Sequence, residues 1–156
     1  MADTETKLKV GEPAPDFTLN SDAGTPVQLS DLHGKRVIIY FYPKDDTPGC
    51  TTQACGLRDA YPHIAERNGV VLGISPDDQQ SHQKFRTKYS LPFTLLMDPD
   101  HQVAEQYGAW GEQTAYGRTH TGIIRSQFIV DEEGRLVDVQ NPIKANASAE
   151  RALQIL

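Results

Sequence analysis

The strongest constraint on the fold is a run of apolar and aromatic residues, RVIIYFYP, at positions 36–43. Its apolar side chains do not alternate with polar ones, which is typical of a strand covered on both faces. Further strands are expected in VVLGIS at 70–75 and in FTLLMD at 93–98. Strands of this kind need layers above and below them, so we expect the core to form around a sheet.

Helical segments separate these strands. Helices are expected from about Cys50, at 77–90 and at 98–108, and a last amphipathic helix is expected at 148–156. Because strand and helix alternate through the middle of the chain, a largely parallel sheet with helices on both faces is predicted.

Antiparallel strands are predicted at two further places. DFTLN at 16–20 and PVQLS at 26–30 flank a turn, and the segment 122–140 is typical of a hairpin. We find no internal repeat, low-complexity tract or linker. The prediction is therefore an α/β fold with a central mixed, mostly parallel sheet flanked by helices, and with added N-terminal strands. It forms one domain over 1–156, in which residues up to about 10 are a loose arm.

Charge and hydropathy exclude several kinds of partner. The net charge is −6 and no run of Lys or Arg forms a basic stripe, so nucleic acid is not expected as a partner. No apolar stretch approaches the roughly 20 residues that span a bilayer, so no membrane contact is expected either. The opening residues, MADTETKLKVGEPAPDF, contain no hydrophobic signal core, and we expect a soluble, cytoplasmic protein.

The number and spacing of the cysteines and histidines restrict the chemistry that a site could carry out. Two cysteines, Cys50 and Cys55, are too few for a disulfide scaffold and are inert, metal-binding or redox-active. A zinc ion needs about four ligands, and the histidines are scattered without a closely spaced pair, so no metal site is expected. We expect each histidine at the surface: His33, His63, His82, His101 and His120.

A helix that begins near Cys50 would favour the thiolate of this cysteine, because first-turn N–H groups and the helix dipole are positive. Moving a thiol pKa from about 8.5 to about 6 requires roughly 3.4 kcal/mol. A helix terminus supplies about 0.3–1 kcal/mol, and near 2 kcal/mol at best. Asp45 and Asp46 work in the opposite direction. A cation or charge-assisted hydrogen bonds, each contributing about 1.5–3 kcal/mol, must therefore come from elsewhere.

Two basic residues are candidates for this cation. Lys44 is close in sequence but expected in solvent, whereas Arg125 lies inside the apolar run GIIRSQFIV at 122–130. An arginine in a buried strand must find an anion. The pattern is equally compatible with a place on the polar face of an edge strand.

The second thiol cannot reach the first on an intact helix. Residues five apart differ by about 140° around the axis and by about 7.5 Å along it, so their Cα atoms are roughly 8–9 Å apart. A disulfide needs about 7 Å or less. Helical spacing directs Cys50 inward and Cys55 toward water.

The helix that carries both thiols is intrinsically weak. Thr51 and Thr52 are β-branched, Gly56 costs about 1 kcal/mol relative to alanine, and Pro62 should kink or end the helix. Such a helix suits a cycle in which the first turns unravel as the thiols join. The residues alone leave open a second interpretation, two buried cysteines in a frayed helix.

The segment FYPKDDTPGCT resembles the active-site motif of the peroxiredoxins, with Pro43, Thr47 and Cys50 at the motif positions. The wider run TPGCTTQACGLRD at 47–59 resembles the bacterioferritin comigratory protein, or peroxiredoxin Q, subgroup, in which a second cysteine follows five positions later. The resemblance continues through segments that cover nearly the whole chain: GEPAPDFTL, VVLGISPD, FTLLMDPDHQVAEQYGAWGE and GIIRSQFIVDEEG.

The resemblance implies a thioredoxin-like fold and a thiol peroxidase that reduces hydrogen peroxide and organic hydroperoxides in antioxidant defence. Cys50 would be the peroxidatic cysteine and become a sulfenic acid. Cys55 would resolve it as an intramolecular disulfide, which thioredoxin or a similar dithiol would reduce. An in-chain disulfide needs no second subunit, so a monomer is expected. Haem, flavin and metal cofactors are not used in this family.

The resemblance also implies roles around the thiol. Thr47 would be the hydroxyl partner of thiolate and peroxide, Pro43 would shield the pocket, and Arg125 would pair with thiolate and substrate. Backbone N–H groups near Gly49 and Cys50 would hold the peroxide oxygens. Some relatives carry glutamate where Gln53 stands, so the role of that position is open.

Two other functions compete with the peroxidase. A disulfide reductase of the thioredoxin type favours cysteines three apart, and the spacing of five argues against it. A redox-sensing binding or chaperone module would leave Thr47 and Arg125 without a role. Reduction of hydrogen peroxide by the pre-reduced protein separates these functions.

Overall fold

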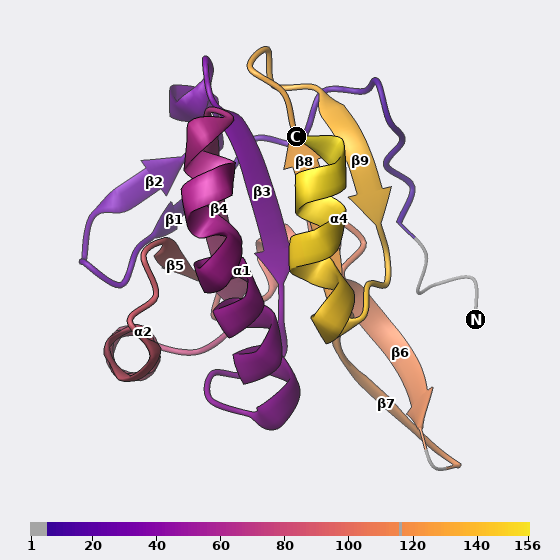
Figure 1. Ribbon diagram of the computed structural model, residues 1–156. Helices are drawn as coiled ribbons and strands as arrows, with labels where there is room; N and C mark the ends of the chain where they lie inside the picture. The colour runs from indigo at the N-terminus through magenta and orange to yellow at the C-terminus, as the bar shows by residue number, and fades with distance from the viewer. Residues whose placement is uncertain (1–5, 116) are drawn as a thin grey trace.

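A computed structural model describes residues 6–115 and 117–156, which are built around a five-stranded sheet (Figure 1). The strands of this sheet are β3 (Arg36–Phe41), β4 (Gly69–Ser75), β5 (Thr94–Met97), β8 (Ser126–Val130) and β9 (Leu136–Gln140). Their order is β5-β4-β3-β8-β9. The β3–β4 and β4–β5 pairs are parallel, whereas the β3–β8 and β8–β9 pairs are antiparallel.

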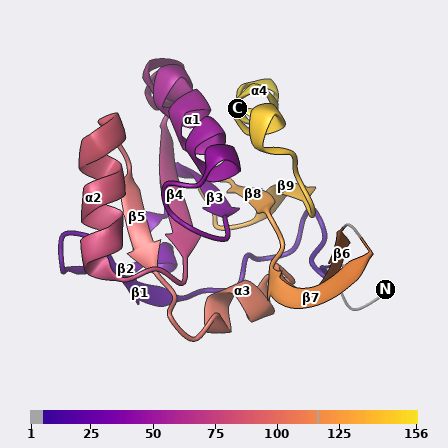
Figure 2. The same cartoon turned by 90° about the horizontal axis from the view of Figure 1, so that it is seen from below.

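Two layers cover this sheet, as Figure 2 shows. Three helices lie on one face. One short helix and an antiparallel pair of short strands lie on the other face. The helices of the first face are α1 (Pro48–Glu66), α2 (Gln79–Tyr89) and α4 (Ser148–Ile155). The second face carries α3 (Gln102–Gln106), β1 (Thr18–Asn20) and β2 (Pro26–Gln28). The described residues also contain two 3₁₀ helices, η2 (Leu29–Leu32) and η3 (Ala145–Ala147).

Strand β3 contributes side chains to both halves of the core. Ile39 and Phe41 pack in the cluster that includes α3, while Ile38 and Tyr40 pack in the cluster that includes α1, α2 and α4. Cys50 belongs to this second cluster. The prediction of a strand covered on both faces is confirmed.

The N-terminal segment contacts both outer strands of the sheet. The Asp22 N–H donates to the Leu95 carbonyl of β5 at 2.9 Å. At the opposite edge, the Gly11 N–H donates to the Leu136 carbonyl and the Leu136 N–H donates to the Glu12 carbonyl, both at 2.8 Å. Residues 11–22 therefore hydrogen-bond to both edge strands of the sheet, β9 and β5.

The predicted arm is described only in part. Residues 1–5 lie outside the described residues, and the Thr6 N–H donates to the Asn141 side chain at 2.9 Å. Leu8 packs against the core. The single domain over 1–156 stays a prediction, as does the loose arm.

The predicted fold class is confirmed, with an evenly mixed rather than mostly parallel sheet. One element was not predicted, the antiparallel ribbon of β6 (Trp110–Ala115) and β7 (Arg118–Ile123). Residues 122 and 123, expected to begin the hairpin of 122–140, belong to this ribbon, and the hairpin consists of β8 and β9. The ribbon is largely polar, and four consecutive residues of β7 are exposed, so no apolar alternation marks it.

The prediction that Pro62 ends or kinks the first helix fails in its first part, because α1 continues through Pro62 to its end at Glu66. Leu57 and Ile64, on either side of the proline, are both fully buried, so packing favours continuation despite the missing N–H. Among the described residues, no helix combines the length and the apolar character needed to cross a bilayer.

The helix predicted at 98–108 is shorter and comprises only α3. Residue His101 has φ 48°, a left-handed conformation that interrupts a helix. The Asp98 carboxylate accepts the N–H groups of Val103 and Ala104 at 3.3 and 3.0 Å. Residues 98–101 therefore form a turn that caps the helix rather than its first turn.

We expect Gly73→Ala to lower the free energy of unfolding by about 1–3 kcal/mol. A Cβ atom at Gly73 would lie 2.9 Å from both Cζ and the hydroxyl oxygen of Tyr40 and from Cδ2 of Leu95. The matched control is Gly122→Ala in β7, where a Cβ atom meets only the His120 ring, at 3.6 Å or more. Urea unfolding of both variants measures the difference, and equal stabilities would contradict the prediction.

Candidate active site

The N-terminus of α1 holds Cys50 in a buried position. Thr47 is the N-cap residue with extended backbone, and Pro48 follows at the first helical position, where the absence of an N–H costs nothing. The Thr47 carbonyl accepts the Thr51 N–H at 2.8 Å. Cys50 thus lies in the first turn and is 1% exposed, which confirms that this cysteine faces inward.

Arg125 brings its guanidinium to this thiol from a site 75 residues further along the chain. Its Nη2 donates to Cys50 Sγ at 3.4 Å and its Nη1 donates to Gln53 Oε1 at 2.6 Å. Arg125 lies between β7 and β8, so both suggested strand positions are wrong. A short connection between two strands lets this charged side chain reach the buried sulfur while remaining partly exposed itself.

Gly49 permits the approach of the guanidinium. A Cβ atom at this position would lie 3.1 Å from Nη2 of Arg125 and 3.9 Å from its Cζ. Any side chain at residue 49 would therefore crowd the group that contacts the thiol. The same residue lies in the first turn of α1, where N–H groups lack intrahelical acceptors and attract anions.

Gln53 links the guanidinium to the C-terminal helix. It is fully buried, and its Nε2 donates to Ser148 Oγ of α4 at 3.2 Å. The Ser148 hydroxyl donates to Gln127 Oε1, and Gln127 Nε2 donates to the Ser148 carbonyl at 3.1 Å. The charge of Arg125 is thus held by a neutral amide, so that no carboxylate at this position competes with the sulfur for it.

Two predicted site residues lie on the approach to the helix. The Thr47 hydroxyl donates to the Lys44 carbonyl at 3.0 Å, and Thr47 is half-buried. Pro43 follows β3 and is exposed. The structure therefore assembles Gly49, Cys50 and Arg125 in direct contact and keeps Thr47 in the adjoining loop. The catalytic roles of these residues stay predictions.

The second thiol lies on the same intact helix. Cys55 is partly exposed, and both cysteines are free thiols. Gly56 faces α4, where a Cβ atom would make an ordinary contact of 3.6 Å with Ala149 Cβ. Since helical geometry separates the thiols by roughly 8–9 Å at Cα, their bond requires the helix to open.

A tyrosine pair adjoins the buried thiol. Tyr40 stacks on Tyr42 with ring centroids 5.3 Å apart. Burial, and next the charge of Cys50, raises the pKa of Tyr40 well above its ordinary value. Its hydroxyl has no hydrogen-bond partner among the described residues. The phenol therefore stays protonated near the sulfur.

Sequence reasoning missed several polar residues. The expectation that every histidine lies at the surface is wrong for His82, which is completely buried. His101 is half-buried and stacks on Trp110 with centroids 3.6 Å apart. The apolar run around Gln127 was a usable signal, because a glutamine inside such a run needs a buried partner.

Comparison with known proteins gives consistent matches along the chain. The sequence pattern of the AhpC/TSA family matches residues 10–139. Peroxiredoxin Bcp of Bacillus subtilis is 45% identical over 149 residues, covering 96% of this chain and 95% of that protein. A putative peroxiredoxin bcp of Haemophilus influenzae is 53% identical over 137 residues, covering 88% of each.

Solved structures of similar proteins share the fold. The bacterioferritin comigratory protein of Xanthomonas campestris, described for its alkyl peroxide reduction activity, has a TM-score of 0.85 at 31% identity, covering 96% of both chains. Peroxidoxin BcpB of Mycobacterium tuberculosis has a TM-score of 0.84 at 33% identity, covering 95% of this chain and 96% of that one. The expected thioredoxin-like fold is confirmed.

We expect Arg125→Gln to lower the thiolate fraction of Cys50 at pH 7 about tenfold or more. A charge-assisted hydrogen bond contributes about 1.5–3 kcal/mol, and about 1.4 kcal/mol corresponds to a factor of ten. Absorbance at 240 nm in a Cys55→Ser background measures this thiolate alone. Arg118→Gln on the exposed face of β7 is the control, and equal thiolate fractions in the two variants would contradict the prediction.

Proposed function

The chain belongs to the AhpC/TSA family and, within it, to the Bcp peroxiredoxins, and from this premise we propose its catalytic cycle. The enzyme is a thiol peroxidase that reduces hydrogen peroxide and organic hydroperoxides to water and alcohols. Cys50 reacts with the peroxide, Cys55 resolves the product as a disulfide, and thioredoxin or a similar dithiol restores both thiols. The contact between Arg125 and the Cys50 sulfur, 3.4 Å long, carries this proposal.

The first step is attack of the Cys50 thiolate on the O–O bond. The sulfur loses two electrons and becomes a sulfenic acid, while the leaving oxygen takes a proton and departs as water or alcohol. Negative charge moves from sulfur to oxygen during this step. Arg125 and the N–H groups of Gly49 and Cys50 are suited to stabilise it, because they are fixed before the reaction begins.

The second step joins the two cysteines. The Cys55 thiol gives up its proton and attacks the sulfenic sulfur of Cys50, the S–S bond forms as the S–O bond breaks, and the leaving hydroxide takes a proton and departs as water. Residues 50–55 must leave the helix for this bond to form, and Gln53, at the middle of the segment, must give up its bonds to Arg125 and Ser148. Thr51, Thr52 and Gly56 favour this opening because they are weak helix formers.

The third step is thiol–disulfide exchange with an external dithiol. A thiolate of the dithiol attacks one sulfur of the Cys50–Cys55 bond to form a mixed disulfide, and its second thiol then releases both cysteines in the reduced form. We further propose that the enzyme works as a monomer in the cytoplasm, where a disulfide within one chain needs no second subunit and reductants keep thiols reduced.

A coupled assay tests the whole cycle. The reduced protein is mixed with hydrogen peroxide or an alkyl hydroperoxide, in the presence of thioredoxin, thioredoxin reductase and NADPH, and NADPH oxidation is followed. We expect sustained turnover with a rate constant for peroxide far above that of free cysteine. A rate no better than free cysteine would favour a sensor or chaperone module.

Replacing each cysteine in turn should separate the peroxide-reducing step from the resolving step. Cys50→Ser should abolish peroxide consumption, because the nucleophile is lost. Cys55→Ser should consume about one peroxide per chain, stall with thioredoxin and then over-oxidise to sulfinic acid. Mass spectrometry of peroxide-treated, alkylated protein checks both, and should find residues 50 and 55 joined in the wild type. Sustained thioredoxin-linked turnover of Cys55→Ser would show that another thiol resolves Cys50.

Ser148→Ala should make the helix open more readily. It removes the partner of Gln53 Nε2 and of Gln127 Oε1, and a hydrogen bond contributes about 0.5–1.5 kcal/mol to stability. We expect amide exchange of residues 51–56 to accelerate roughly 2- to 10-fold, and disulfide formation with it, since about 1.4 kcal/mol is a factor of ten. Asn146→Ala, an exposed change just before α4, is the control. Unchanged exchange in Ser148→Ala would argue against this role.

A further inference from the structure

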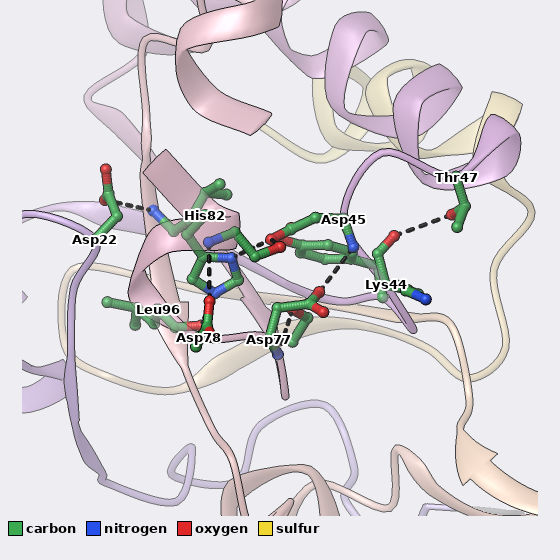
Figure 3. Close-up of polar contacts among 12 residues, drawn as sticks. Asp22, Lys44, Asp45, Thr47, Asp77, Asp78, His82 and Leu96 are labelled. Atoms are coloured by element: carbon green, nitrogen blue, oxygen red, sulfur yellow. Dashed lines mark hydrogen bonds and ion pairs between the residues drawn. The ribbon is translucent and has the colours of Figure 1, made fainter. Parts of the chain in front are cut away.

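A buried histidine outside the reaction described above is fastened to the loop that leads into α1. We call residues 42–47 the active-site loop, since it joins β3 to the helix of Cys50. His82 of α2 is 0% exposed, with Nδ1 2.7 Å from Oδ2 of Asp45 in this loop. Its Nε2 lies 2.9 Å from the Leu96 carbonyl oxygen of β5. Figure 3 shows the imidazole between these two partners.

The partners determine where the protons lie. A backbone carbonyl only accepts, so Nε2 of His82 carries a hydrogen. Asp45 accepts at both oxygens from other groups, at 2.5 Å from the Tyr42 hydroxyl and at 2.8 Å from the Ser81 hydroxyl. Burial raises the pKa of Tyr42 well above its ordinary value, so the phenol donates. Two hydroxyl groups thus donate to Asp45, one at each oxygen, which fits an ionised carboxylate that also accepts a second imidazole hydrogen, on Nδ1 of His82.

Further charges surround this pair. The Asp77 carboxylate accepts the Asp45 N–H and the Ser75 hydroxyl, both at 2.7 Å. Asp78, the exposed N-cap of α2, is engaged with the Ser81 N–H at 2.9 Å. Burial lowers the pKa of His82, but the hydrogen bond and charge of Asp45, the Leu96 carbonyl and the charge of Asp77 outweigh it and raise the pKa.

A metal ion is a weaker interpretation of the same cluster. One ligand atom each of Asp45, Asp77 and His82 lies within 4.8 Å of the others. An imidazole that donates from both nitrogens has no lone pair left for a metal. The cluster is therefore an ion pair with one additional carboxylate.

On the basis of the proposed function, we propose that His82 is a positioning residue of the peroxidase, a buried imidazolium that holds the active-site loop through Asp45. The main chain of the loop is also held by the Tyr42 N–H, which donates to the Ile74 carbonyl at 3.1 Å, and by the Asp45 N–H, which donates to Asp77. Lys88 and Tyr89 of α2 donate to the exposed Asp46 at 2.8 and 2.9 Å, so His82 is the buried one of the side chains of α2 that hydrogen-bond to this loop. Pro43 and Thr47 lie on either side of Asp45 in this loop, and α1 starts directly after Thr47.

The positive charge of His82 also offsets negative charge that would disfavour the thiolate of Cys50. Asp45 in this loop and Asp77 beside it would otherwise be two uncompensated carboxylates at the segment that leads to Cys50, and negative charge disfavours a thiolate. With His82 charged, two negative groups and one positive group remain. The charge of His82 therefore offsets that of Asp45, so this carboxylate anchors the loop with less opposition to Arg125 at the sulfur.

Nuclear magnetic resonance of the reduced, ¹⁵N-histidine-labelled wild-type protein tests the protonation directly. We expect protons on both ring nitrogens of His82 at pH 7.5. The His82 signals are assigned by their loss in His82→Asn. A single protonated ring nitrogen at His82 overturns the proposal, whether or not the protein reduces peroxide.

Stopped-flow kinetics test the positioning role. His82→Asn keeps a neutral donor toward Asp45 but loses the charge, and we expect its rate constant with hydrogen peroxide to fall about tenfold, a loss of about 1.4 kcal/mol. The double variant His82→Asn/Asp45→Asn keeps a neutral hydrogen-bonding pair between α2 and the loop and removes the uncompensated carboxylate, so it should recover to within about threefold of wild type. His63→Asn, exposed on α1, is the control. A double variant no faster than His82→Asn overturns the proposal.

Alkylation of Cys50 by iodoacetamide, in a Cys55→Ser background, repeats this comparison without peroxide. The rate should fall in His82→Asn and recover in the double variant, in the same order as the peroxide reaction. If wild-type protein alkylates rapidly but does not reduce peroxide, the proposed function fails while the role of His82 stands. If alkylation is the same in all variants, the role of His82 is overturned.

The pH dependence of stability follows from the same pair. Because the folded-state pKa of His82 is raised, its stabilising contribution is fully present below the unfolded-state value of about 6.5 and is lost as pH rises through the folded-state value. The difference in unfolding free energy between wild type and His82→Asn should therefore shrink as the pH is raised above that point. A difference that grows with pH would contradict an imidazolium.

Discussion

The contact on which the site depends is the one between the Arg125 guanidinium and the buried sulfur of Cys50. A thiolate at 1% exposure is costly without a cation, and a helix terminus alone compensates for only part of that cost. The cation comes from the connection between β7 and β8, so α1 and this connection must come together before the contact forms. Much of the α/β core can be understood as the frame that brings these two segments together.

The neutral amide of Gln53 explains how the same arrangement can be both firm and reversible. A carboxylate at this position would bind Arg125 more tightly and share its charge with the sulfur. An amide holds the guanidinium with a hydrogen bond and continues, through Ser148 and Gln127, into α4 and β8. Opening the helix then disrupts neutral hydrogen bonds at Gln53 and separates no buried carboxylate from its cation.

Much of this architecture could be predicted from the sequence, because continuous apolar runs marked β3, β4 and β5 and because helical spacing directed Cys50 inward. The polar strands β6 and β7 could not, since their pairing to each other stabilises them without an apolar face. The position of Arg125 beside the thiol was open until the chain was folded, as it depends on a short connection between two strands. His82 was misjudged for a related reason: its partners Asp45 and Leu96 are distant in sequence, so nothing local indicates a buried ion pair.

The N-terminal segment that hydrogen-bonds to both outer strands of the sheet affects how copies of the chain meet one another. An outer strand normally presents a row of unpaired amide and carbonyl groups, onto which a strand of another molecule can add. Here the main chain around Gly11 and Asp22 already occupies groups in both rows, at Leu136 and at Leu95. Growth of the sheet from one molecule to the next is thereby disfavoured at both edges.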